Sequence, residues 1–256
     1  MSVDVIVVGA GIAGLACARH LAEHGLQVVV LDKGRGIGGR MATRRDALSS
    51  GEARFDHGAQ YFMAKTDGFR RMLEGLPGAS AGWQDGADQS FIVGVPGMSA
   101  VPRALAAGLN VRQEVEVTEL LSTPHGWIVQ TADAQFEAAR VVVTVPAPQV
   151  APLLGKNDPL VEQIAHVTMA PSLTLMAAFP AGSPMPFASR RSENEDLAWI
   201  ARDSSKPGRP DTTVNWVAQA SPRWSADHLE ADKDAISALM LPMLCNVIGT
   251  APDDAV

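Results

Sequence analysis

The sequence predicts an α/β protein in which a parallel sheet is followed by a mostly antiparallel one. Val3–Val8 is a short β-branched run that ends in glycines, as a buried parallel strand does. Ile12–His24 has the apolar spacing of a helix and is stopped by Gly25. Gln27–Leu31 is a second buried strand. These segments predict a strand–helix–strand unit at the start of the chain.

The later elements are predicted from the same signals. Lys33–Arg54 is rich in Gly and Arg and is expected to be an ordered loop. Helices are expected at Asp67–Leu76, Pro102–Gly108 and Glu230–Leu244, and Pro242 should kink or end the last one. Further strands are expected at Phe91–Val95, Val111–Leu121, Trp127–Thr131 and Val141–Val145. The second, mostly antiparallel sheet is expected at Ser172–Phe179, Leu197–Arg202 and Thr213–Ala220.

Composition excludes several classes of protein. The chain has 256 residues with a net charge of −7, a poor match for nucleic acid or an anionic membrane surface. No run reaches the ~20 apolar residues of a membrane span, and Asp4 replaces the basic start of a signal peptide. Cys17 and Cys245 are too far apart for a zinc motif, and the histidines show no paired ligand spacing. We expect a cytoplasmic protein without a metal site.

The first motif is the hexapeptide GAGIAG, which joins the first strand to the first helix. Gly9 allows a tight turn, Gly11 lets the backbone approach a pyrophosphate, and Gly14 lets the helix pack closely on the sheet. Ile12 and Ala13 open the helix, whose free N–H groups and dipole favour an anion. The motif predicts a dinucleotide site.

The second motif is DKGRGIGGRM, which begins at the end of the second strand. Asp32 is placed to accept hydrogen bonds from ribose hydroxyls, or else is a helix N-cap or a solvated strand end. An NAD dehydrogenase would continue into a crossover helix, whereas this chain continues with glycines and two arginines. Arg40, beside Gly39, is the preferred phosphate ligand, and Arg35 is either a second ligand or a surface charge. This departure favours FAD over NAD.

The third motif is FDHGAQYF, Phe55 to Phe62. Gly58 and Ala59 are small, as is needed where backbone lies against a flat ring. Gln60 and Tyr61 follow as polar candidates near that ring. His57 is either a polar group at the same place or a packed loop histidine.

Taken together, these motifs resemble the flavin-dependent amine oxidase superfamily, and the finer match is to its renalase-like branch. PGMSAVPRAL, VVVTVPAPQVAPLL, LAWIARDSSKPGR and VNWVAQASPRWS extend the resemblance along the chain. The resemblance implies a Rossmann-type FAD-binding domain at 1–65 and 98–156, with an inserted substrate domain of antiparallel sheet plus helix at 66–97 and 157–256. It adds Lys33 and Met41 to the cofactor-contacting positions. Val117 is either a backbone contact to the adenine half or a core valine.

The resemblance also implies a reaction. Renalase-like enzymes pass hydride from isomers of reduced nicotinamide dinucleotides to flavin N5 and on to oxygen, giving hydrogen peroxide. Oxidation of an amine or a polyene is the alternative enzyme class, and a non-catalytic dinucleotide-binding fragment is a third possibility. Amine oxidases often hold a lysine near N5 through a water. Lys206 is the candidate for that role, although Pro207 and Gly208 beside it favour an exposed turn.

Family members continue for several tens of residues beyond the position matched by Val256. That tail carries a Gly-Asp motif and a helix that approach the flavin. The resemblance therefore implies that the FAD domain lacks a closing strand, that the strand at Val141–Val145 has an uncovered edge, and that FAD is held weakly. Trp199, Trp216 and Trp224 either line a pocket or, for at least two of them, pack in a core.

Overall fold

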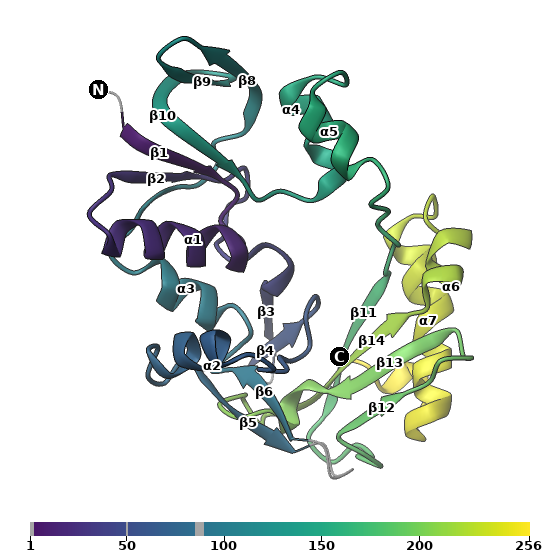
Figure 1. Ribbon diagram of the computed structural model, residues 1–256. Helices are drawn as coiled ribbons and strands as arrows, with labels where there is room; N and C mark the ends of the chain where they lie inside the picture. Colours follow the sequence, from purple (N-terminus) through teal and green to yellow (C-terminus); the bar gives the residue numbers. More distant parts are fainter. Residues whose placement is uncertain (1–2, 50, 85–89) are drawn as a thin grey trace. The chain divides into compact units, whose positions relative to one another are not determined.

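The computed structural model describes residues 3–49, 51–84 and 90–256. The chain divides into two compact units, one formed by residues 1–41 and 101–169 and the other by residues 42–100 and 170–256. Each unit is described by itself below, with its elements labelled as in Figure 1. In the described part of the chain, no helix is long and apolar enough to cross a membrane.

The first unit is built on a six-stranded sheet in the order β7-β2-β1-β10-β9-β8. β7, β2, β1 and β10 are parallel, whereas β10, β9 and β8 are antiparallel. The strand bounds are β1 Val3–Val8, β2 Val28–Leu31, β7 Asn110–Arg112, β8 Val117–Thr123, β9 Gly126–Thr131 and β10 Gln135–Val143. The helices are α1 Ile12–Glu23, α3 Ala100–Ala106, α4 Ala151–Leu154 and α5 Pro159–Ile164, with short 3-10 turns at Gly39–Met41 and Ala147–Gln149.

The predicted strand–helix–strand unit is confirmed by β1, α1 and β2. The single strand predicted at Val111–Leu121 is wrong, because β7 and β8 are separate strands of the sheet. Between them the chain turns back onto the end of β2. There the N–H of Val115 donates to the carbonyl of Asp32 at 2.9 Å, and Glu114, with φ 58°, donates to Gly34. This turn interrupts an apolar pattern that looks continuous in the sequence.

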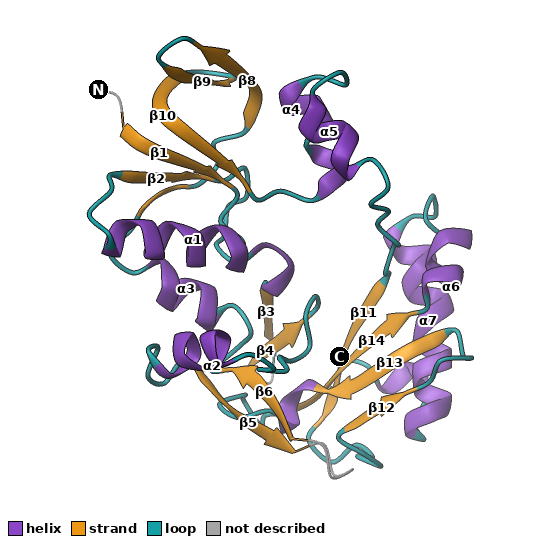
Figure 2. Cartoon of the chain, in the orientation of Figure 1, coloured by secondary structure: helices purple, strands orange, loops and turns teal. Residues whose placement is uncertain are grey.

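The second unit contains an antiparallel sheet in the order β11-β14-β13-β12. Its strands are β11 Thr174–Pro180, β12 Ser189–Arg191, β13 Leu197–Arg202 and β14 Thr213–Ala220. Two hairpins accompany it, formed by β3 Thr43–Leu48 with β4 Gly51–Asp56 and by β5 Ser80–Gln84 with β6 Ser90–Gly94. The helices are α2 Asp67–Glu74, α6 Pro222–Asp227 and α7 Lys233–Ile248, with 3-10 turns at Asp203–Ser205 and Pro252–Asp254. Figure 2 distinguishes these strands from the helices.

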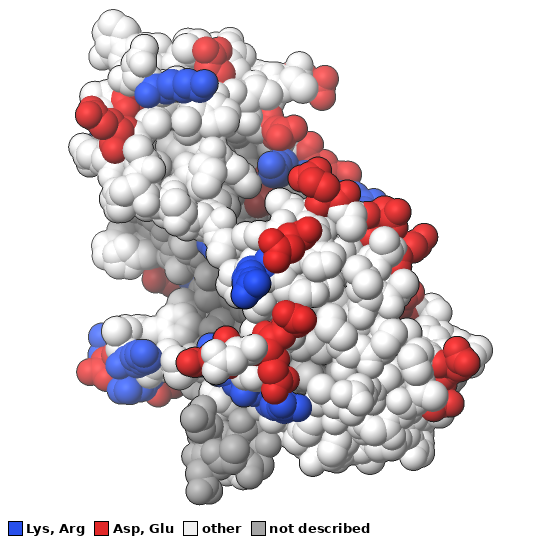
Figure 3. Space-filling model, turned by 90° about the vertical axis from the view of Figure 1, so that its right-hand side faces the viewer, with Lys and Arg blue, Asp and Glu red and all other residues white. Residues whose placement is uncertain are grey.

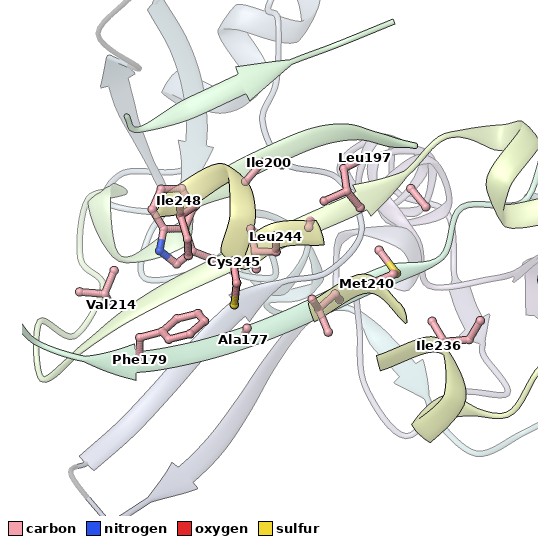
Figure 4. Close-up of a cluster of buried hydrophobic side chains, with 14 of the residues drawn as sticks. Ala177, Phe179, Leu197, Ile200, Val214, Ile236, Met240, Leu244, Cys245 and Ile248 are labelled. Atoms are coloured by element: carbon pink, nitrogen blue, oxygen red, sulfur yellow. The ribbon is translucent and has the colours of Figure 1, made fainter. Parts of the chain in front are cut away.

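One face of the antiparallel sheet is covered by α7. Met240 and Leu244 of α7 are fully buried in a cluster that includes Phe179 of β11 and Trp216 of β14. Figure 4 shows residues of this cluster between helix and strands. Burial of apolar side chains contributes ~25 cal/mol per Å², so this cluster is a main source of stability for the unit. Elsewhere on β14, Val217 packs with Ala53 and Phe55 of β4, and Gln219 contacts the turn of the site described below.

One prediction that extends from the first unit into this one is wrong in detail. Lys33–Arg54 is not a loop throughout, because it contains a 3-10 turn and the β3–β4 hairpin. Four consecutive exposed residues in β3 remove the alternation that identifies a strand, whereas β4 buries Ala53 and Phe55. Of the two effects predicted for Pro242, an end to the last helix is excluded, since α7 continues through it to Ile248, and a kink stays a prediction.

The compact units do not follow the predicted domain boundaries at every point. Residues 42–65, assigned from the sequence to the FAD-binding domain, cluster with the second unit. The functional assignment of the two domains therefore stays a prediction. On the face drawn in Figure 3, acidic side chains are scattered with Lys and Arg side chains among them, in keeping with the net charge of −7.

Candidate functional site: a glycine-lined dinucleotide site and a buried ion cluster

The glycine loop connects β1 to α1 in the first unit. Gly9 has φ 107°, a conformation that strains any residue with a side chain. Gly11 is the N-cap of α1 and forms no side-chain cap, and the first turn carries no acidic residue. A Cβ built at Gly11 would meet no atom within 4 Å. The N-terminus of α1 is therefore an open, uncapped site with donors for an anion.

Asp32, at the end of β2, holds this loop in place. One carboxylate oxygen accepts a hydrogen bond from the N–H of Ala10 at 2.5 Å, and the other accepts from Gly34 at 2.7 Å. The carboxylate thus ties the glycine loop to the segment that follows β2. It retains lone pairs for further donors, so a bond to ribose hydroxyls stays a prediction.

The second motif lies directly beside the first. The N–H of Gly38 donates to the carbonyl of Ala10 at 3.0 Å, and a Cβ at Gly39 would come within 3.6 Å of the Cα of Gly11. Arg40 follows Gly39 and is exposed. The structure therefore brings together glycines that lie almost thirty residues apart, and Arg40 directly follows one of them.

The other predicted cofactor residues of the first unit are placed as follows. Lys33 and Arg35 are exposed, and Lys33 pairs with Glu116 at 3.8 Å. Met41 is buried, and Val117 is buried in the core of the six-stranded sheet. These residue types fit a bound dinucleotide, because the open helix N-terminus offers N–H donors and the closely packed glycines leave its approach unobstructed.

The third motif forms a turn in the second unit, directly after β4. Gln60 is buried, and its amide nitrogen donates to the carbonyls of Asp56 and Gly58, the latter at 3.2 Å. Gln219 of β14 donates to the same Gly58 carbonyl at 2.8 Å. Two side-chain amides thus hold the 56–60 turn from its carbonyl side.

Asp56, Asp203, Lys206 and Arg209 form what we call the buried ion cluster. Their charged side chains are fully buried in the ion pairs Lys206–Asp203, Lys206–Asp56 and Arg209–Asp56, the second of which has an N–O distance of 3.3 Å. Asp56 also accepts from the N–H of Met98 at 2.9 Å and from the hydroxyl of Thr43 at 2.7 Å. The cluster joins β4 to the Asp203–Ser205 turn and to the segment that follows it.

Burial and pairing act in opposite directions on the two carboxylates. Burial alone would raise the pKa of Asp56, but Lys206 and Arg209 outweigh it and hold that pKa below its usual value. For Asp203 burial prevails, and the negative charge of Asp56 adds to it, so its pKa is raised. The two carboxyl groups therefore have different affinities for a proton although they share one lysine.

Several aromatic side chains lie next to the buried ion cluster. The ring of Tyr61 stacks on Phe91 with 4.0 Å between centroids and lies 5.4 Å from Trp199. The Lys206 ammonium lies 5.5 Å from the ring of Trp83. By contrast, Trp216 and Trp224 pack in the hydrophobic cluster that includes Met240 and Leu244 of α7.

The interpretation of Lys206 as part of an exposed turn is wrong. Its side chain is 0% exposed, since Asp203 and Asp56 compensate its charge inside the unit. Sequence reasoning also missed Asp56, Asp203 and Arg209 as site residues. The available signal was that the segments FDHGAQ and DSSKPGR each pair acids or amides with small residues. His57 lies half-buried at the turn, and its role stays a prediction.

Two family models match the chain. Residues 7–76 match the NAD(P)-binding Rossmann-like domain, and residues 82–256 match the flavin containing amine oxidoreductase family. A putative flavin-containing monoamine oxidase, AofH of Mycobacterium tuberculosis, is 52% identical over 46 residues, which are 18% of this chain and 10% of AofH. The chain thus matches only a small share of the length of such curated relatives.

Solved structures share the fold over the whole chain. Putrescine oxidase bound to putrescine has a TM-score of 0.76 at 14% identity, covering 100% of this chain and 84% of the other. Cyclohexylamine oxidase from Brevibacterium oxydans IH-35A has a TM-score of 0.76 at 13% identity, covering 100% and 83%. The predicted α/β fold with a Rossmann-type FAD-binding domain is confirmed. Since the second family match spans more than half of the sequence, the chain belongs to the flavin containing amine oxidoreductase family, and its cofactor is FAD.

Proposed function

We propose that the protein is an FAD-dependent oxidase of a small organic hydride donor. The observation that carries this proposal is the open glycine loop, with an uncapped helix N-terminus beside Gly39 and Arg40. When bound, the flavin supplies the redox chemistry, taking hydride from the substrate and passing two electrons to oxygen to give hydrogen peroxide. The protein residues bind the cofactor and position the substrate.

Each part of the chain has a role in this proposal. The N–H groups at Gly11, Ile12 and Ala13 bind the pyrophosphate, and Arg40 adds a charged donor. The 56–60 turn presents Gly58 and Ala59 to the flavin ring, where small residues allow close approach. Tyr61, with its aromatic neighbours, provides a surface against which a planar substrate can stack.

For the substrate we propose an isomer of a reduced nicotinamide dinucleotide, as in the renalase-like branch. A dihydropyridine gives up hydride without prior deprotonation. Lys206 is held by two carboxylates, so it is not a free base at this site. Amine oxidation is the second candidate, favoured by the names of putrescine oxidase and cyclohexylamine oxidase among the proteins of the same fold.

Anaerobic reduction of the flavin separates the two substrate classes. We expect dihydronicotinamide dinucleotide isomers to bleach the flavin absorbance faster than putrescine or cyclohexylamine at equal concentration. Stopped-flow absorbance of the FAD-loaded protein measures this directly. Faster bleaching by either amine would move the protein to the second class. A protein that bound NAD but no flavin would contradict the proposed function altogether.

Arg40→Ala should weaken FAD binding by about 1.5–3 kcal/mol, the range for a hydrogen bond to a charged group. Titration of the apoprotein with FAD, followed by flavin fluorescence, gives the dissociation constant. Arg190→Ala is the control, because Arg190 is exposed and pairs with Glu195 in the second unit. An Arg40 variant that binds FAD as tightly as the parent would show that Arg40 does not contact the pyrophosphate.

A further inference from the structure

We propose that Lys206 is a positioning residue for the flavin-facing turn, acting through Gln60. The inference rests on the proposed function, in which the 56–60 turn contacts the flavin. It differs from a catalytic role for the lysine, because the ammonium is occupied by groups of the protein itself. Asp203 and Asp56 hold it by ion pairs, and Gln60 Oε1 accepts a hydrogen bond from it at 3.3 Å.

The chemistry of these groups fixes the orientation of the Gln60 amide. An ammonium can only donate, so it requires the oxygen of the amide. The carbonyls of Asp56 and Gly58 can only accept, so they require the nitrogen. With Lys206 present, one orientation of the amide satisfies all of its partners. Without it, the oxygen would be left unpaired in a buried site, and only the carbonyls of Asp56 and Gly58 would still hold the amide in this orientation.

The fixed amide in turn fixes the backbone of the turn. Gln60 binds two carbonyls within four residues of itself, and Gln219 binds the Gly58 carbonyl from β14. The carbonyls of Asp56 and Gly58 are thereby engaged by side chains. In the proposed complex, the N–H side of Gly58 and Ala59 is the part of the turn that meets the ligand. A preorganised turn binds its ligand without the entropic cost of being ordered on binding.

The burial of the cluster explains why a lysine serves this purpose. All four charged side chains are fully buried, so the ammonium keeps a fixed position with few alternative partners. Arg209 bonds to the carbonyl of Gly94 at 3.2 Å and to Asp56, which anchors the acid that Lys206 shares. Because the ammonium of Lys206 is held in place by the cluster, its hydrogen bond also holds the Gln60 amide in place.

The test is a double-mutant cycle between Gln60 and Lys206. Lys206→Met alone would leave excess negative charge buried and could unfold the unit, so it is combined with Asp203→Asn, which keeps the net charge. The cycle compares the parent, Q60A, D203N/K206M and the triple variant. For each, the FAD dissociation constant and the urea unfolding curve of the apoprotein are measured. Ser225→Ala is the matched control, since it removes a buried hydroxyl that accepts from the N–H of Leu173 and does not belong to the buried ion cluster.

We expect Q60A and D203N/K206M each to raise the FAD dissociation constant about tenfold. The triple variant should bind no more than twofold worse than either, because both changes remove the same arrangement. S225A should be destabilised but bind FAD within twofold of the parent. Unchanged FAD binding by D203N/K206M, or losses that multiply in the triple variant, would overturn the proposal. If the parent itself bound no FAD, the proposed function would fail, and additive losses in the unfolding cycle would overturn this inference separately.

Discussion

Replacing Asp56 with alanine should lower the free energy of unfolding by about 3–5 kcal/mol, the cost of removing one partner from a buried ion pair. Asp56 is the common acceptor of Lys206 and Arg209, and both cations are fully buried. Without it, only the Asp203 carboxylate faces two cations. The N–H of Met98 and the hydroxyl of Thr43 would lose their acceptor as well. A loss of this size is comparable to the whole stability of many domains.

Urea unfolding, monitored by tryptophan fluorescence, measures this loss. Asp46→Ala is the control, because Asp46 pairs with Arg44 at 3.5 Å on the surface with both side chains more than half exposed. Surface pairs contribute about 0–1 kcal/mol, so this variant should unfold close to the parent. If D56A were as stable as D46A, the cluster would not be a source of cohesion for the second unit.

The buried ion cluster should also make the free energy of unfolding depend on pH in the acid range. The pKa of Asp56 is lowered in the folded protein, chiefly because Lys206 and Arg209 overcome the effect of its burial. A carboxylate with a lowered folded pKa contributes stability above its unfolded pKa and loses it as the pH falls through the folded value. The parent should therefore lose stability below the usual carboxyl range, and D56A should lose less over the same interval. Unfolding curves collected from neutral pH downward test this, and a pH dependence that was the same in the two proteins would contradict it.

The first unit could be predicted from the sequence because its signals are local. The glycines of GAGIAG sit at fixed spacing between a strand and a helix, and the structure has β1 and α1 there. Asp32 is predicted from the same local pattern, and its bonds to Ala10 and Gly34 show that it shapes the loop, whereas its bond to a ribose stays a prediction. Residues whose structural role depends on neighbours only a few positions away give a sequence pattern from which that role can be predicted.

The buried ion cluster could not be predicted because Asp56 is distant in the chain from the other three members. Lys206 and Asp56 are 150 residues apart, and a lysine beside Pro-Gly ordinarily belongs to an exposed turn. Only the folded β4 and the Asp203–Ser205 turn bring the charges together. The β3–β4 hairpin was missed for a related reason, since β3 is exposed along most of its length and carries no apolar alternation.

Gly14→Ala and Gly11→Ala should separate folding from cofactor binding at the glycine loop. A Cβ on Gly14 would collide with the carbonyl oxygen of Gly9 and come within 2.7 Å of the Thr144 hydroxyl. The first of these is backbone and cannot move without shifting α1 from β1. Such overpacking costs about 1–3 kcal/mol or more, so G14A should lose stability and FAD binding together.

Gly11→Ala should leave the apoprotein within about 1 kcal/mol of the parent, because alanine at an N-cap typically costs ~1 kcal/mol relative to a good cap, against a few tenths for glycine. Its Cβ meets no atom within 4 Å, and its φ of −74° suits any residue. In the proposed complex, however, that open space is where the pyrophosphate approaches the backbone. Losing two charged hydrogen bonds of about 1.5–3 kcal/mol each would weaken FAD binding more than 100-fold. Urea unfolding and FAD titration of both variants measure the two effects separately. A G11A protein that held FAD like the parent would mean that the cofactor does not lie against this loop, whereas loss of FAD at unchanged stability would locate the pyrophosphate at the start of α1.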